Sequence, residues 1–131
     1  MAKITSTIKN ELYKVEITSP SSNVVIADEP VVMGGKDLGF SPKELLASAL
    51  AACTSATLRM YANHKGWELE EVKLEIELEF DSKENKTFII RKLELIGNLD
   101  ETQRIRLLKV AESCPIHKIL TNQIEINTQV V

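Results

Sequence analysis

The sequence has no excess of basic residues, few cysteines and no apolar stretch at its start. Its 131 residues carry 16 Lys and Arg against 19 Asp and Glu, which gives a net charge of −3. This balance provides neither a basic footprint for nucleic acid nor a basic amphipathic helix for a membrane surface. The opening residues Met-Ala-Lys-Ile-Thr lack the apolar core of a secretion signal. We therefore expect a cytoplasmic protein without a nucleic-acid or membrane partner.

The chain has only two cysteines, Cys53 and Cys114. In the reducing cytoplasm we expect the two cysteines to be functional thiols rather than a permanent structural disulfide. The alternative for Cys53 is a small core residue, and the alternative for Cys114 is a half-buried residue at a helix cap.

Residues 41–66 predict a long helix around which the chain is organised. Ser41 can cap its start and Glu44 stands at the capping-box position, while Gly66 offers a left-handed stop. No charged residue occurs among the 14 positions between Glu44 and Arg59. An amphipathic surface helix would show a polar stripe there, so we expect this helix to be buried all round.

Two kinds of cover are possible for such a helix. A membrane span needs about 20 apolar residues, and this uncharged run of 14 also carries four hydroxyl groups, which argues against a membrane. A single small domain has little spare structure to wrap a helix completely. We therefore expect a homodimer, with a monomer that wraps the helix in its own sheet as the alternative. Small residues that permit close helix approach are Ala47, Ser48, Ala49, Ala51, Ala52 and Ala56.

The rest of the chain falls into blocks of strands and helices. The pattern predicts three short strands within 3–28, a loop over 29–40, a strand over 72–80, its hairpin partner over 87–96, helices starting after Asp100 and at Pro115, and a last strand over 124–130. A change in the parity of apolar residues predicts a bulge near Arg91. Blocks of this kind indicate an α+β fold, with antiparallel sheets packed around the long helix in one domain over residues 1–131.

The predicted helix starts favour Cys114 over Cys53 as a thiolate. Cys114 stands at the expected cap of the helix beginning at Pro115, where unpaired amide groups favour negative charge, and His117 follows one turn later. Cys53 lies mid-helix, where the amide groups are already paired and burial disfavours an anion. An outside group must therefore stabilise a Cys53 thiolate.

A metal site would have to use the four sulfur and imidazole side chains. Cys53 and His64 are separated by about 16 Å along a helix, so these two and the pair Cys114 and His117 cannot converge on one ion. We expect no metal and no other cofactor. We expect His64 to be a helix-end residue and His117 a surface residue. The row Glu75, Glu77 and Glu79 is expected to be a solvated strand face.

Three segments together resemble the OsmC/Ohr family of osmotically inducible and organic hydroperoxide resistance proteins. They are Ser-Pro-Lys-Glu-Leu-Leu at 41–46, Ala-Ala-Cys-Thr at 51–54 and Cys-Pro-Ile-His-Lys at 114–118. The resemblance implies an OsmC-like fold and an intertwined homodimer with its sites at the subunit interface. It also implies a peroxidase in which Cys53 attacks an organic peroxide, Cys114 resolves the product and an external dithiol reduces the pair.

The sequence departs from the family pattern at the residues that support the attacking thiolate. No arginine precedes Arg59, and the family glutamate position holds Lys43. Glu44, one place further, is rotated by about 100° around the helix and does not take that role. Lys36 and Lys43 could supply positive charge, although no motif assigns either. The alternative is therefore a non-catalytic protein that binds a small apolar ligand at the dimer interface.

Overall fold

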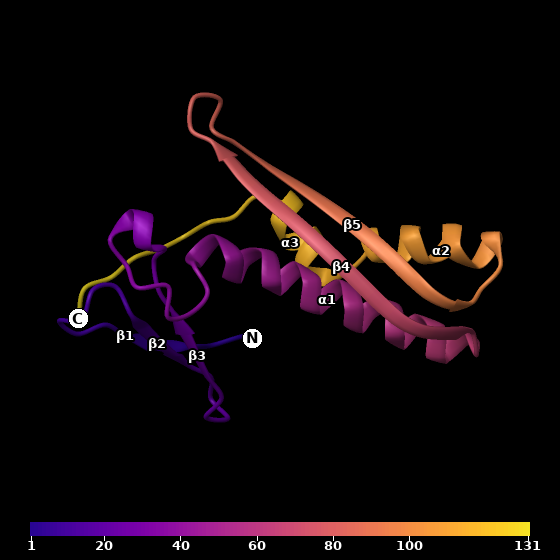
Figure 1. Ribbon diagram of the computed structural model, residues 1–131, viewed down its shortest axis with the longest axis horizontal. Helices are drawn as coiled ribbons and strands as arrows, with labels where there is room; N and C mark the ends of the chain where they lie inside the picture. The colour runs from indigo at the N-terminus through magenta and orange to yellow at the C-terminus, as the bar shows by residue number, and fades with distance from the viewer. The chain divides into compact units, whose positions relative to one another are not determined.

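Short antiparallel strands, one long helix, a long hairpin and two shorter helices follow one another in the computed structural model, which describes residues 1–131 (Figure 1). The elements are β1 (Thr5–Thr7), β2 (Val15–Thr18), β3 (Val24–Ala27), the 3₁₀ helix η1 (Val31–Met33), α1 (Pro42–Lys65), β4 (Glu68–Asp81), β5 (Lys86–Asn98), α2 (Glu101–Glu112) and α3 (Pro115–Thr121). One antiparallel sheet has the order β1-β2-β3, and β4 pairs with β5 in the other. This arrangement confirms the predicted α+β class.

The chain forms two compact units, Met1–Leu46 and Ala47–Val131, so the prediction of a single domain stays a prediction. In the first unit the buried carboxylate of Asp28 holds the loop that follows β3. It accepts hydrogen bonds from four backbone N–H groups, those of Tyr13, Glu29, Lys36 and Leu38. Burial disfavours the charge, but these four bonds outweigh it and hold the pKa of Asp28 below its ordinary value.

The ends of α1 are set by the residues that the sequence indicated. Ser41 and Glu44 form the reciprocal capping box, with the Ser41 N–H donating to Glu44 Oε1 at 2.9 Å and the Glu44 N–H donating to Ser41 Oγ at 3.2 Å. Gly66 follows the last helical residue with φ of +69°, a left-handed conformation that suits glycine. Both predicted boundaries of the helix are confirmed.

In the single chain, helix α1 is buried on one face, and burial on all sides, which we expect with a second copy of the chain, stays a prediction. The buried residues Leu50, Thr54, Leu58 and Ala62 recur every fourth position, and the opposite side is exposed. A single chain of this size supplies cover for one face only. By length and composition α1 alone could cross a membrane. Leu58 and Ala62 on its packed face belong to the buried core of the second unit.

The hairpin β4–β5 presents an apolar face and an acidic face. Side chains facing the interior pair across the strands as Val72 with Leu95, Leu74 with Leu93, Ile76 with Arg91, and Leu78 with Ile89. The pairing is regular through Arg91, so the predicted bulge there is wrong, and the register shifts instead between Leu69 and Glu71. Arg91 therefore occupies an interior-facing position of the strand.

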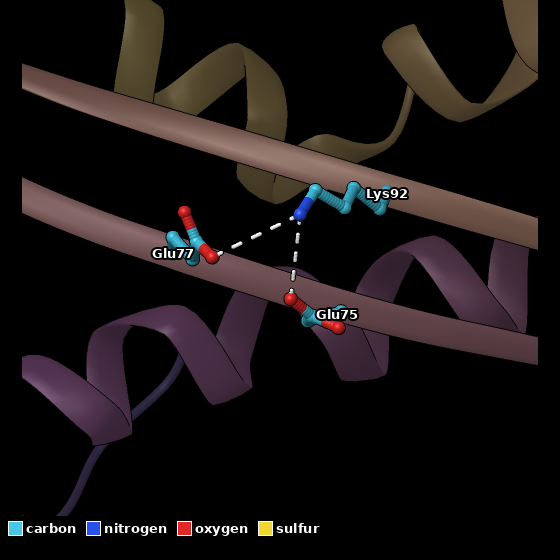
Figure 2. Close-up of polar contacts among 3 residues, drawn as sticks. All are labelled: Glu75, Glu77 and Lys92. Carbon is cyan, nitrogen blue, oxygen red and sulfur yellow. Dashed lines mark ion pairs between the residues drawn. The ribbon is translucent and has the colours of Figure 1, made fainter.

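The other face of the hairpin carries exposed glutamates, as predicted. Lys92 Nζ lies 3.5 Å from Glu75 Oε1 and 3.9 Å from Glu77 Oε1, and all three side chains are more than half exposed (Figure 2). Ion pairs that are this exposed contribute little to stability.

The core of the second unit joins α1, the hairpin and α2. Its buried residues are Leu58, Ala62, Leu69, Leu99, Leu107, Val110 and Ala111. Asp100 caps α2 through a capping box with Gln103, and Cys114 caps α3, so both predicted helix starts are confirmed. No strand forms over 124–130, contrary to the prediction, because a strand requires a neighbouring edge and these residues have none in the single chain.

Candidate thiol site

The two cysteines are far apart in sequence and lie next to each other in the structure. Cys53 comes from the middle of α1 and is half-buried, whereas Cys114 at the start of α3 is fully buried. Both are free thiols, and Cys53 is among the neighbours that lower the pKa of the Cys114 thiol. The fold therefore brings the two thiols into one site.

Four groups converge on the sulfur of Cys114. The N–H of His117 donates to Sγ at 3.4 Å, and Thr54 Oγ1 lies 3.8 Å from it. The neighbouring Cys53 thiol and the positive charge of Arg91 also favour the anion. Burial by itself raises the pKa of the Cys114 thiol, but these four groups outweigh burial and lower the pKa below its ordinary value. Cys114 is thus the thiol with support for an anion, as its predicted cap position indicated.

Arg91 reaches this site from β5 and bridges α1 and α3. Its Nη1 donates to Thr54 Oγ1 at 3.0 Å, and its Nη2 lies 3.1 Å from His117 Nδ1. The Thr54 hydroxyl is buried and donates to the Leu50 carbonyl at 2.7 Å. A guanidinium has only hydrogen-bond donors, so Nδ1 of His117 must be the acceptor in this pair.

Sequence reasoning missed Arg91 and Thr54, and it placed His117 incorrectly. His117 is half-buried and bonded to Arg91 rather than free on the surface. The signal for Arg91 was present, since it alternates with Ile89, Leu93 and Leu95 along one strand face. The predicted bulge near Arg91 leaves the face of this residue undetermined, whereas the regular pairing of β5 with β4 fixes it.

The other residues considered from the sequence have different surroundings. His64 is exposed in the last turn of α1, as expected for a helix-end residue, and Lys36 and Lys43 are exposed in the first unit. No group of three or more His, Cys, Asp or Glu side chains is arranged to hold a metal ion. The positive charge beside the thiols comes from Arg91.

A comparison with known families shows to which family the chain belongs. The model of the OsmC-like protein family matches residues 34–129, a span that includes both cysteines. The chain belongs to the OsmC-like protein family. This membership supports a redox or peroxide-stress protein. No curated protein matches the sequence significantly.

Solved structures show that this OsmC-like chain has the family fold. A provisionally assigned osmotic stress induced and detoxification response protein from Psychrobacter arcticus is 23% identical with a TM-score of 0.79, over 91% of this chain and 88% of that one. An OsmC like protein from Mycoplasma pneumoniae is 21% identical with a TM-score of 0.78, over 92% and 86%. The organic hydroperoxide resistance protein OhrB of Bacillus subtilis is 24% identical with a TM-score of 0.64, over 92% and 90%.

Proposed function

We propose that this OsmC-like protein reduces organic hydroperoxides through Cys53 and Cys114, with electrons from an external dithiol. The observation that supports the proposal best is the contact between the two thiols, one half-buried and one fully buried with its anion stabilised. The more exposed Cys53 is the thiol that a peroxide can reach. Cys114 is positioned to accept its proton and later to attack its sulfur.

The proposed cycle begins with a proton transfer between the two cysteines. The proton of the Cys53 thiol moves to the Cys114 thiolate, and the Cys53 thiolate attacks one oxygen of the peroxide. The O–O bond breaks, Cys53 becomes a sulfenic acid, and the leaving alkoxide takes the proton from Cys114 to give an alcohol. The Cys114 thiolate then attacks the Cys53 sulfur, forming a disulfide and releasing hydroxide. An external dithiol reduces this disulfide and is itself oxidised to a disulfide.

We also propose that the protein works as a homodimer in the cytoplasm. The side of α1 opposite its buried face is exposed in the single chain, and it carries Ala49, Ala52, Ala56 and Met60. The alternating segment 124–130 also lacks a strand partner in the single chain. Both features are expected where a second copy completes the packing. Sedimentation equilibrium should give twice the mass of the chain, and a monomer at micromolar concentration would contradict the dimer.

The peroxidase proposal is tested by counting thiols. Reduced protein, freed of reductant, is mixed with a small excess of cumene hydroperoxide, and free thiols and intact mass are measured. We expect rapid loss of both thiols and of two hydrogen atoms in mass. In Cys114→Ser we expect a Cys53 sulfenic acid that dimedone traps, and in Cys53→Ser we expect the Cys114 thiol to survive.

Two results would contradict the proposal. The first is that both thiols remain unreacted in the native protein, which would instead favour binding of an apolar ligand. The second is that thiol loss continues at the same rate in Cys53→Ser, because the accessible thiol would then not be the attacking one. A slower reaction with hydrogen peroxide than with cumene hydroperoxide is expected if apolar side chains surround Cys53.

A further inference from the structure

Arg91 occupies a position where the sheet pattern calls for an apolar side chain. It faces the interior opposite Ile76, and the next residues on its face of β5 are Ile89 and Leu93. A cation in such a place costs desolvation unless its donors are bonded. Both terminal nitrogens of Arg91 have partners, Thr54 Oγ1 and His117 Nδ1. A polar residue that breaks a local pattern and is fully engaged in a site is expected to serve that site.

The two contacts of Arg91 each control a group that touches Cys114. At Thr54, the guanidinium occupies one lone pair of the hydroxyl oxygen, whose single hydrogen serves either the Leu50 carbonyl or the Cys114 sulfur. At His117, the guanidinium engages Nδ1 of the residue whose backbone N–H donates to the same sulfur. Arg91 thus connects β5 with the Cys114 surroundings on both α1 and α3.

We propose that Arg91 is the positioning residue that favours the thiolate form of Cys114, acting through Thr54 and His117 and through its own positive charge. Arg91 thereby supports Cys114 rather than Cys53. The titratable and charged groups that face Cys114 are Cys53 from α1, Arg91 from β5 and His117 from α3. The lowered pKa of Cys114 agrees with this assignment.

The consequence for the cycle rests on the proposed function. A thiolate of the external dithiol attacks the accessible Cys53 sulfur, and the bond between the two protein sulfurs breaks. The electron pair leaves with Cys114, which becomes a thiolate, while Cys53 forms a mixed disulfide with the reductant. The second thiol of the reductant then releases Cys53 and completes its own disulfide. Stabilisation of the Cys114 anion makes Cys114 the better leaving group.

The test titrates the thiolate of Cys114 without any peroxide. In a Cys53→Ser background, where serine keeps a donor beside Cys114, absorbance at 240 nm is followed against pH. The spectrum of the doubly substituted Cys53→Ser/Cys114→Ser protein is subtracted to remove tyrosine ionisation. Arg91→Met and Arg91→Gln remove the charge, and Arg91→Lys keeps it without the fork. Arg106→Met is the matched control, because Arg106 is an exposed residue of α2 whose side chain donates to the Tyr61 hydroxyl and not to any group of the thiol site.

We expect the titration midpoint to rise in Arg91→Met and Arg91→Gln, to rise less in Arg91→Lys, and to stay unchanged in Arg106→Met. If Arg91→Met does not fold by circular dichroism, Arg91→Gln decides. The proposal would be overturned if folded Arg91→Met or Arg91→Gln had the same titration midpoint as the Cys53→Ser parent. It would also be overturned if Arg106→Met raised the midpoint as much as these variants do. Because no peroxide is present, a failed peroxidase assay leaves this result intact, and an unchanged midpoint leaves the peroxidase proposal intact.

Discussion

Replacing Thr54 by valine removes one hydroxyl from the centre of the thiol site while nearly preserving the shape of the side chain. The hydroxyl oxygen accepts from Arg91 at 3.0 Å, and the group lies 3.8 Å from the Cys114 sulfur. Its own hydrogen reaches the Leu50 carbonyl at 2.7 Å. The Leu50 carbonyl also accepts the helical N–H of residue 54, so it keeps a hydrogen bond when valine replaces threonine. Arg91 is therefore the group that loses a partner in Thr54→Val.

The magnitude follows from these contacts. A hydrogen bond to a charged group contributes about 1.5–3 kcal/mol, and the half-buried Arg91 can regain part of this from water. We expect Thr54→Val to lower the free energy of unfolding by about 2 kcal/mol. The matched variant Thr54→Ser keeps the hydroxyl and loses one buried methyl group, which costs about 1 kcal/mol. The larger separation is expected in the titration of Cys114, because only valine removes a group that lowers its pKa.

Both quantities can be measured on the same preparations. Urea unfolding of the reduced proteins is followed by fluorescence of Trp67, the single tryptophan, which packs edge-on against Tyr61 at the core with ring centroids 5.6 Å apart. Protein concentration is held constant, since a dimer would make stability depend on it. The thiolate midpoint is read at 240 nm in the Cys53→Ser background.

Either of two results would contradict the role of the Thr54 hydroxyl. Thr54→Val could prove as stable as the native protein, which would mean that the bond from Arg91 contributes nothing. Alternatively, the Cys114 midpoint could stay the same in Thr54→Val, or rise equally in Thr54→Ser. In that case the hydroxyl would have no part in stabilising the anion.

Three further predictions concern the scaffold. Leu58→Ala leaves a cavity at a fully buried position and should lower the unfolding free energy by about 3 kcal/mol. Leu108→Ala, at a position that is 55% exposed, should lower it by less than about 1 kcal/mol. Similar losses in the two variants would contradict the described core. Asp28→Asn should speed hydrogen exchange at the Leu38 amide. In the native protein the Asp28 carboxylate protects the Leu38 amide from exchange, and its lowered pKa keeps it ionised at neutral pH. We expect this protection to be lost as pH falls below about 4, and a protection that does not change with pH would contradict the prediction. Gly66→Ala should cost about 1 kcal/mol in urea unfolding, because φ is +69° while the space beside the Cα is open, and an unchanged stability would contradict the left-handed stop.

The sequence was informative wherever a local rule sets the structure. The caps at Ser41, Asp100 and Cys114 were predictable because a side-chain acceptor three residues before a free amide is a local feature. Gly66 was predictable for the same reason. The hairpin followed from the strict alternation over 72–80. These elements place Cys114 at a helix start, which is half of the candidate site.

The other half depends on contacts between distant segments. Phe88, Ile89 and Ile90 are three consecutive apolar residues, so the face of β5 is ambiguous until pairing with β4 fixes it. Thr54 reads as an ordinary helix residue until Arg91 is known to lie above it. The expected strand over 124–130 did not form because alternation alone provides no partner edge.

The regular pairing of β4 with β5 makes the chemistry sensitive to strand length. Side chains alternate between the two faces of the hairpin. Deleting one residue of β5 between the turn and Arg91 would therefore place Lys92 at the interior position and turn the Arg91 guanidinium to solvent. Lengthening the turn at residues 82–85 has no such effect, because the ladder on either side keeps its pairing. Natural or engineered insertions should therefore be tolerated at the tip of the hairpin and should abolish thiolate support a few residues further along.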